Sequence, residues 1–158
     1  MADFILDLRK IVGQRKLIHP AARILVENDK GEFLFIRRTD NGNWGLPAGG
    51  LEENETVLEC AKREVLEETG IELLDLEVIG IGTQPDQETV IYPNGDATQY
   101  FTVEFYSNQW RGTPKADFKE SSEVVFRSEA YKLNLPPHEQ VTFESLQYFK
   151  EQGRIHVR

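Results

Sequence analysis

A Gly-rich turn that runs directly into an acidic helix constrains this chain more than any other feature. Residues 49–71 have the sequence GGLEENETVLECAKREVLEETGI. Thr56 and Glu59 fit a capping box at the start of a helix, and Gly70 suits the left-handed residue after the last turn. The sequence therefore predicts a helix that begins at Thr56 and ends at Gly70.

Three glutamates share one face of this predicted helix. Glu64, Glu67 and Glu68 are spaced i, i+3 and i+4, so they cover an arc of roughly 100°. The apolar stripe next to that arc consists of Leu58, Ala61 and Val65. Like charges at the edge of a buried face repel one another unless a cation lies between them, and oxygen ligands suit Mg²⁺ or Mn²⁺. The alternative is a solvated acidic helix, which the Gly-rich entry and the neighbouring Arg63 disfavour.

The remaining pattern predicts strands on both sides of this helix and a second helix at the end of the chain. Alternating apolar residues and turn clusters predict strands over residues 23–27, 32–38, 76–82, 89–92, 100–106 and 123–126, and a helix over 138–152. The turn 93–96 predicts a hairpin between two of these strands. Strands flanking one strong helix, without a regular βαβα alternation, indicate an α+β fold with a mixed sheet between helices.

The spacing of the acidic segment resembles the signature box of the Nudix (MutT-like) hydrolases. The matching positions are Gly49, Glu55, Arg63, Glu64, Val65, Glu67, Glu68, Gly70 and Ile71. The lead-in at 44–50 and the terminal helix are also similar to that family. The resemblance implies one Nudix domain over residues 1–158, an α/β/α sandwich with a mixed sheet. It also implies attack of water on a diphosphate linkage with Mg²⁺, or Mn²⁺, as the cofactor.

The resemblance also implies roles for individual residues. The implied metal ligands are the carbonyl of Ala48 and the carboxylates of Glu64, Glu67 and Glu68. The implied catalytic set is Glu67, Glu68, Arg63 and Glu120. In this set Arg63 orients the box glutamates, and Glu67 is a ligand or the general base. Glu120 is preferred to Glu123 as the additional glutamate, with a plain surface position as the alternative for both.

Arginines on the first two strands are candidates for binding the substrate phosphates. Arg23 interrupts the apolar run 21–26, so it needs an anionic partner. Arg38 lies at the end of the following strand, beside Arg37. The sequence therefore predicts Arg23 and Arg38 as substrate-binding residues, and the alternative for Arg37 and Arg38 is a solvated strand end.

Composition narrows the partners of the chain. The 158 residues carry 18 Lys and Arg against 27 Asp and Glu, a formal net charge of −9, which disfavours binding of nucleic acid or of an anionic membrane. A single cysteine, Cys60, fits a reducing compartment. The sequence contains no long apolar run, so we expect neither a membrane span nor a leader. We therefore expect a soluble, cytoplasmic protein that acts on a small-molecule nucleotide. A homodimer is left open.

The substrate is less constrained than the reaction. Pro85 lies near the position of a proline in ADP-ribose hydrolases of the family but off its register, and the markers of two other subfamilies are absent. We therefore expect a nucleoside diphosphate derivative, either a nucleotide sugar such as ADP-ribose or a nucleoside triphosphate. The alternative function is a Nudix-like sensor that binds a nucleotide without cleaving it. The intact set Glu64, Glu67 and Glu68 favours the enzyme.

Overall fold

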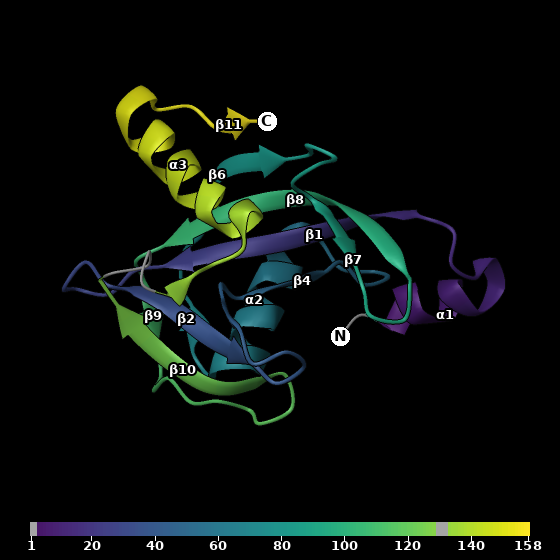
Figure 1. The fold of residues 1–158 in the computed structure, drawn as a ribbon. Helices are drawn as coiled ribbons and strands as arrows, with labels where there is room; N and C mark the ends of the chain where they lie inside the picture. The colour runs from purple at the N-terminus through teal and green to yellow at the C-terminus, as the bar shows by residue number, and fades with distance from the viewer. Residues whose placement is uncertain (1–2, 129–132) are drawn as a thin grey trace.

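A mixed β-sheet forms the centre of the computed structural model, which describes residues 3–128 and 133–158 (Figure 1). Its strand order is β11-β6-β8-β1-β4, with β7 paired to β8. These strands are β1 (Leu17–Val26), β4 (Ala48–Gly50), β6 (Glu77–Gly82), β7 (Thr89–Ile91), β8 (Ala97–Ser107) and β11 (His156–Val157). Because β1 is parallel to β8 and antiparallel to β4, the sheet is mixed, as the sequence predicted.

Two smaller sheets and three helices complete the described part of the chain. The second sheet consists of β10 (Ser121–Arg127), β2 (Phe33–Arg38) and β3 (Trp44–Gly45). A short pair joins β5 (Glu72–Leu73) to β9 (Trp110–Arg111). The helices are α1 (Asp3–Val12), α2 (Val57–Thr69) and α3 (Pro137–Gln152). Among them, none has both the length and the apolar character that crossing a bilayer requires.

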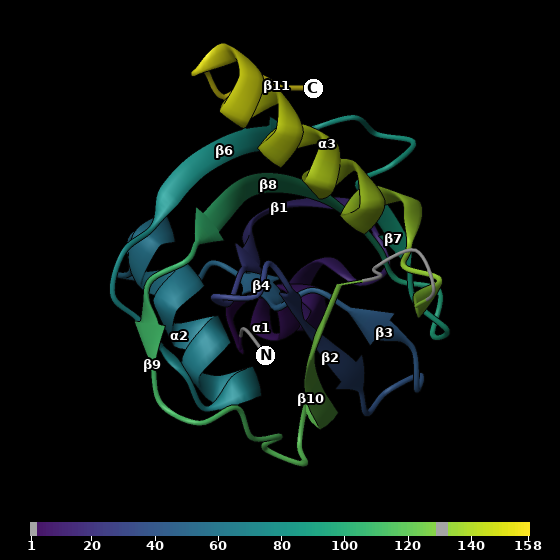
Figure 2. The ribbon, with the colours of Figure 1, turned by 90° about the vertical axis from the view of Figure 1, so that its left-hand side faces the viewer.

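The alternation of side chains along β1 gives the molecule two cores. Ile24 and Val26 point to one face of the sheet and pack with Val65 of α2, whereas Leu25 points to the other face and packs with Leu146 of α3. Each fully buried Leu or Ile contributes roughly 1.5–3 kcal/mol relative to an exposed one. The helices therefore cover opposite faces of the sheet, and Figure 2 shows α3 and α2 on its two sides. This arrangement confirms the predicted α/β/α sandwich.

Both ends of α2 form the caps that the sequence predicted. The Thr56 side chain accepts a hydrogen bond from the Glu59 amide, and the Glu59 carboxylate accepts one from the Thr56 amide. Gly70 ends the helix at φ 73°, in the left-handed region that glycine adopts without steric cost. The hairpin of β7 and β8 around residues 93–96 is also confirmed.

Several segments differ from the sequence-based expectation: the short strands β3, β4, β5 and β9 were not predicted, and β1, α1 and β11 also differ. β1 begins at Leu17 and not at Arg23, although Pro20 lies within it, because β8 pairs with its whole length. The sequence did not predict α1, which is joined to the hairpin by Arg9, whose guanidinium donates to the carbonyl of Ala97 and the hydroxyl of Thr98. The two-residue strand β11 is too short to give a periodic signal. β1, α1 and β11 all depend on pairing with distant segments.

Candidate functional site

Three carboxylates from two elements meet at the inner face of α2. Glu64 and Glu68 are only 1% and 2% exposed, because their face of the helix is turned toward the Gly-rich turn and β10. Glu120 approaches from the loop that precedes β10. Each residue can offer one oxygen such that all three oxygens lie within 4.8 Å of one another. We call Glu64, Glu68 and Glu120 the carboxylate trio.

The Gly-rich turn is shaped to receive the trio. A Cβ atom placed on Gly49 would lie 2.0 Å from the carboxyl carbon of Glu64, so no larger residue fits there unless Glu64 moves. The next residue back, Ala48, donates its amide hydrogen to Oε2 of Glu68 at 3.1 Å. The turn and α2 are therefore fitted to each other at the two buried glutamates.

The electrostatics of the trio favour a bound cation. Burial raises the pKa of Glu64 to about 6, although the adjacent Arg63 opposes that rise. Burial, followed by the charge of Glu64, raises the pKa of Glu68 well above its usual value. Both shifts record the cost of keeping negative charge at this place without a counter-ion. Three converging oxygen donors of this kind fit Mg²⁺ or Mn²⁺.

Arg63 links the first residues of the Nudix box to Glu64 on α2. Its guanidinium donates to both carboxylate oxygens of Glu55, at 3.0 and 2.6 Å, and to Glu64 at 2.7 Å. It also donates to the carbonyl of Gly50 at 3.2 Å. Such a bidentate pair fixes geometry as well as charge. Arg63 therefore joins Glu64 to the Gly-rich turn, and its role in orienting the box glutamates stays a prediction.

Glu67 lies apart from the trio. Its side chain is 52% exposed and pairs at 3.4 Å with Nη1 of Arg63, the atom that also pairs with Glu64. The structure thus brings together Glu64, Glu68 and Glu120 and does not bring Glu67 to them. The predicted arc of roughly 100° is wide enough to include both positions: Glu68, at i+4, lies on its buried side, and Glu67, at i+3, lies on its exposed side.

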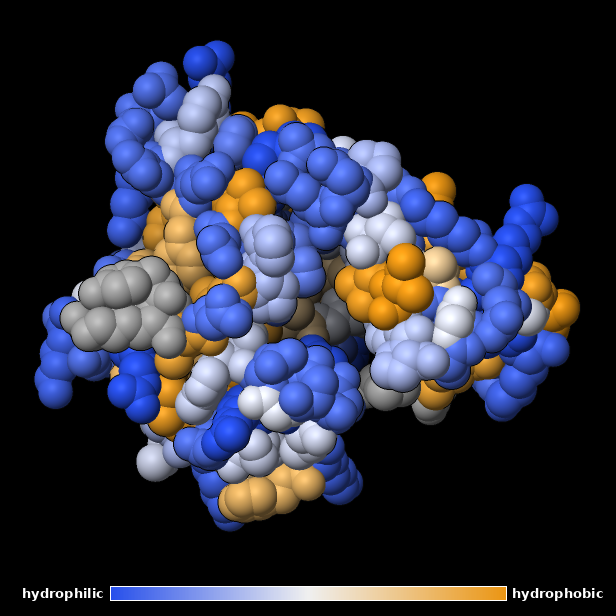
Figure 3. Space-filling model, viewed as in Figure 1, coloured by the Kyte–Doolittle hydropathy of each residue, from blue (hydrophilic) through white to orange (hydrophobic). Residues whose placement is uncertain are grey.

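Arg38 lies where its charge reaches the site. It is 40% exposed and pairs with Asp40 through Nε and Nη2, at 3.1 and 2.9 Å. Its charge opposes the rise in the pKa of Glu68 and of Glu139. In Figure 3 the surface is hollowed between two parts of the molecule. One part contains α1 and the β7–β8 hairpin, and the other is the rest of the fold. Arg37, by contrast, pairs with Glu123 on the surface.

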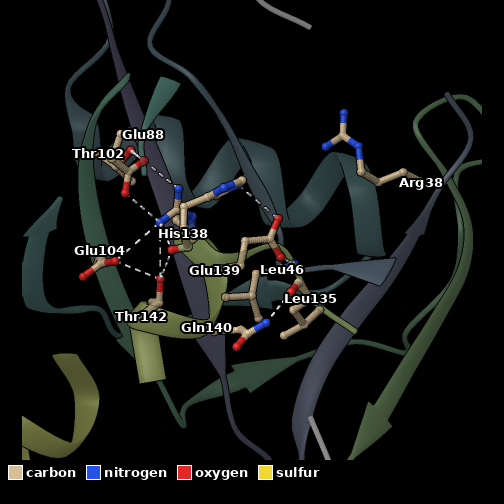
Figure 4. A network of polar contacts seen from close by, with 12 residues as sticks. Arg38, Leu46, Glu88, Thr102, Glu104, Leu135, His138, Glu139, Gln140 and Thr142 are labelled. Carbon is tan, nitrogen blue, oxygen red and sulfur yellow. Dashed lines mark hydrogen bonds and ion pairs between the residues drawn. The ribbon is translucent and has the colours of Figure 1, made fainter. Parts of the chain in front are cut away.

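Arg23 has its anionic partners inside the protein. It is 5% exposed and donates to both oxygens of Glu88, at 3.2 and 2.9 Å, with Glu104 at 3.4 Å. Its other acceptors are the carbonyl of His138 and the hydroxyl of Thr142 (Figure 4). The requirement for an anionic partner is met, but by internal carboxylates and not beside the trio. Glu88 and Glu104 are far away in sequence, so no local signal could have identified them.

Glu139 is a buried charged residue that sequence reasoning missed. It lies in the first turn of α3, is 7% exposed, and accepts a hydrogen bond from the amide of Leu46 at 2.7 Å. A glutamate in the first turn of a helix is common, since it opposes the helix dipole, so its sequence position carries no specific signal. Only the packing of α3 on the sheet brings it to the segment that leads into the Gly-rich turn.

Replacing Gly49 with alanine should disturb the trio through Glu64. The new Cβ must displace the Glu64 carboxylate, so we expect Gly49→Ala to reduce the rise in melting temperature on adding Mg²⁺. The check is a double-mutant cycle: in a Glu64→Ala background, Gly49→Ala should have little further effect on that rise. Additive effects of the two substitutions would show that Gly49 acts by another route.

Comparison with known proteins identifies relatives of this arrangement. The family model described as NUDIX domain matches residues 17–149. An RNA pyrophosphohydrolase of Halorhodospira halophila is 44% identical over 61 residues, and a MutT-like protein of Streptomyces ambofaciens is 48% identical over 60. These matches cover 39% and 38% of this chain but only 34% and 38% of those proteins. The crystal structure of a MutT protein from Methanosarcina mazei Go1 is 26% identical, with a TM-score of 0.67, over 89% of this chain and 99% of that one.

Proposed function

Because the chain belongs to the Nudix family, we propose that it is a Mg²⁺-dependent pyrophosphohydrolase, with Mn²⁺ as a substitute ion. The observation that carries this proposal is the carboxylate trio, in which Glu64 and Glu68 are buried against the Gly-rich turn. Holding these charges together is costly without a cation, and the same ion serves chemistry at a diphosphate. The proposed ligands are Glu64, Glu68 and the carbonyl of Ala48, with Glu120 as the third carboxylate.

Each residue of the site has a separate task in this proposal. A bound divalent ion neutralises the diphosphate and makes a coordinated water more acidic. Glu64 and Glu68 hold the ion, and Arg63 keeps Glu64 in place. Glu120, which is half-buried, or the more exposed Glu67 accepts the proton of the attacking water. Arg38, whose side chain is accessible near Glu68, binds a phosphate of the substrate.

We propose a nucleoside diphosphate derivative as the substrate, either a nucleotide sugar such as ADP-ribose or a nucleoside triphosphate. The net charge of −9 makes a long polyanion a poor partner, because such partners bind through many Lys and Arg contacts to phosphates. A small nucleotide needs only the bound ion and a single arginine. The relatives named RNA pyrophosphohydrolase nevertheless make a 5′-triphosphorylated RNA a necessary member of any substrate panel.

The test is a hydrolysis screen over ADP-ribose, other nucleotide sugars, nucleoside triphosphates and 5′-triphosphorylated RNA. We expect turnover of at least one small nucleotide with Mg²⁺ and none after chelation. Glu120→Gln and Glu67→Gln, assayed on that substrate at saturating Mg²⁺, identify the base as the variant with the larger loss of kcat. Saturable nucleotide binding without any product, with Mg²⁺ or Mn²⁺ present, would favour the non-catalytic sensor instead.

A further inference from the structure

The first turn of α3 makes one direct contact with the segment that leads into the site. Oε2 of Glu139 accepts the amide hydrogen of Leu46 at 2.7 Å, as Figure 4 shows. Leu46 lies between β3 and β4, two residues before Ala48. This contact joins the helix on one face of the sheet to the Gly-rich turn that faces α2.

Besides the pairing of β4 with β1, three hydrogen bonds hold residues 46–48. The Leu46 amide donates to Glu139, the Pro47 carbonyl accepts from the Ile24 amide at 2.9 Å, and the Ala48 amide donates to Glu68 at 3.1 Å. The contact at Pro47 is backbone to backbone, and the contact at Ala48 comes from the trio itself. Glu139 therefore supplies the side-chain contact that ties this segment to a layer outside the trio.

The surroundings of Glu139 are built around its carboxylate. A Cβ atom on Gly45 would lie 3.1 Å from Oε1 and 3.2 Å from Oε2, so glycine leaves the space that this carboxylate occupies. Burial raises the pKa of Glu139 to about 7, against the opposing charges of Arg23 and Arg38. Burying a carboxylate here costs more free energy than burying a neutral amide, which could accept the same hydrogen bond.

We propose that Glu139 is a positioning residue that fixes residues 46–48 and thereby the carbonyl of Ala48 that the metal ion is proposed to bind. The inference rests on the proposed function, since it assigns Glu139 a task for the same site. Without Glu139, the Leu46 amide would have no acceptor from α3. The pairing of β4 with β1 and the Glu68 contact would then position the Ala48 carbonyl without the anchor at Leu46, and we expect the carbonyl to shift relative to Glu64 and Glu68. Groups that orient metal ligands typically change metal affinity 10–100-fold when removed.

A purely structural role for Glu139 predicts a different result. If Glu139 only joins α3 to the sheet, its loss lowers the melting temperature but leaves metal affinity unchanged. Ser145→Ala is the matched control, because Ser145 is also polar, fully buried and on α3, and its hydroxyl contacts His156. It therefore samples the stability of the helix without touching residues 46–48.

The experiment measures Mn²⁺ affinity by calorimetry without substrate, and amide hydrogen exchange of residues 46–49 without metal. For Glu139→Ala we expect Mn²⁺ binding weakened about 10–100-fold and faster exchange at Leu46. Glu139→Gln, whose amide oxygen can accept the same bond, should stay within about threefold of the parent. Ser145→Ala should change neither quantity. If Glu139→Ala does not fold, Gly45→Ala crowds the same carboxylate, whose oxygens must move by a few tenths of an ångström, and should weaken Mn²⁺ binding in the same direction.

Two outcomes separate this inference from the function on which it rests. Parent-like Mn²⁺ affinity in Glu139→Ala, with a melting temperature lowered as in Ser145→Ala, would overturn the positioning role alone. A parent protein that neither binds Mn²⁺ nor hydrolyses any nucleotide would overturn the proposed function itself. The hydrogen-exchange result remains informative in that case, because it reports on the loop without any metal.

Discussion

Glu68→Gln is expected to reduce hydrolysis roughly 10²–10³-fold at ordinary Mg²⁺ concentrations, the range observed when one preorganised electrostatic contact is lost. The substitution keeps the shape and volume of a side chain that is 2% exposed, so it removes charge and little else. If Glu68 binds the ion, its amide replacement is a poorer ligand for a hard cation. The measurement is kcat and KM on the best substrate of the nucleotide screen, with Mg²⁺ varied.

The stability of the same variant gives a second, independent readout. Without metal, Glu68→Gln should melt at the parent temperature or above it, because a buried carboxylate next to Glu64 has been neutralised. Mg²⁺ should then raise its melting temperature less than that of the parent, since ligand stabilisation follows RT ln(1 + [L]/Kd) and Kd has increased. An inactive but metal-responsive variant would place Glu68 in the chemistry and outside the metal site.

The control for Glu68→Gln is the same chemical change at an exposed helical position. Glu144 lies on α3 with its side chain in solvent, so Glu144→Gln should leave turnover, melting temperature and the Mg²⁺ shift unchanged. Full turnover by Glu68→Gln, with a parental Mg²⁺ shift, would mean that the metal is held elsewhere. The assignment of the trio would then be wrong.

The sequence predicted the part of the site that is encoded locally. The capping box at Thr56, the left-handed Gly70 and the i, i+4 pair Glu64 and Glu68 all act within one helix, so their geometry follows from its periodicity. The position of Gly49 could also be predicted, because the resemblance to the Nudix box fixes its spacing from Glu64. These features could be predicted before the tertiary fold was known.

The parts that could not be predicted depend on contacts between distant segments. Glu139 is 93 residues from Leu46, and Arg23 is 65 residues from Glu88, so neither pair leaves a periodic trace. The sequence showed that Arg23 needs an anion, but not whether that anion belongs to the protein or to a ligand. Only the packing of α3 and β8 against β1 supplies the answer, because it buries Glu88 and Glu104 beside Arg23.

Arg23→Met is accordingly expected to destabilise the fold strongly. The substitution keeps a long apolar stem but removes the cation that pairs with Glu88, which is 1% exposed; Glu104 keeps a second partner, Arg158, at 2.5 Å. Breaking a buried ion pair from one side costs about 3–5 kcal/mol, because an uncompensated charge stays buried. For a domain of this size that corresponds to a fall in melting temperature on the order of 10 °C. Thermal unfolding of the metal-free protein measures it directly.

The partner side of the network distinguishes a structural role of Arg23 from the substrate contact predicted from the sequence. Adding Glu88→Gln to Arg23→Met should recover part of the lost stability, because Glu88 is then neutral, whereas Glu104 keeps its ion pair with Arg158 in both variants. Arg37→Met is the matched control. Arg37 pairs with Glu123 at side-chain exposures of 46% and 48%, so its loss should change stability by less than about 0.5–1 kcal/mol. A parental melting temperature for Arg23→Met together with a raised KM would contradict the structural role, since the partner of Arg23 in the working protein would then be the substrate.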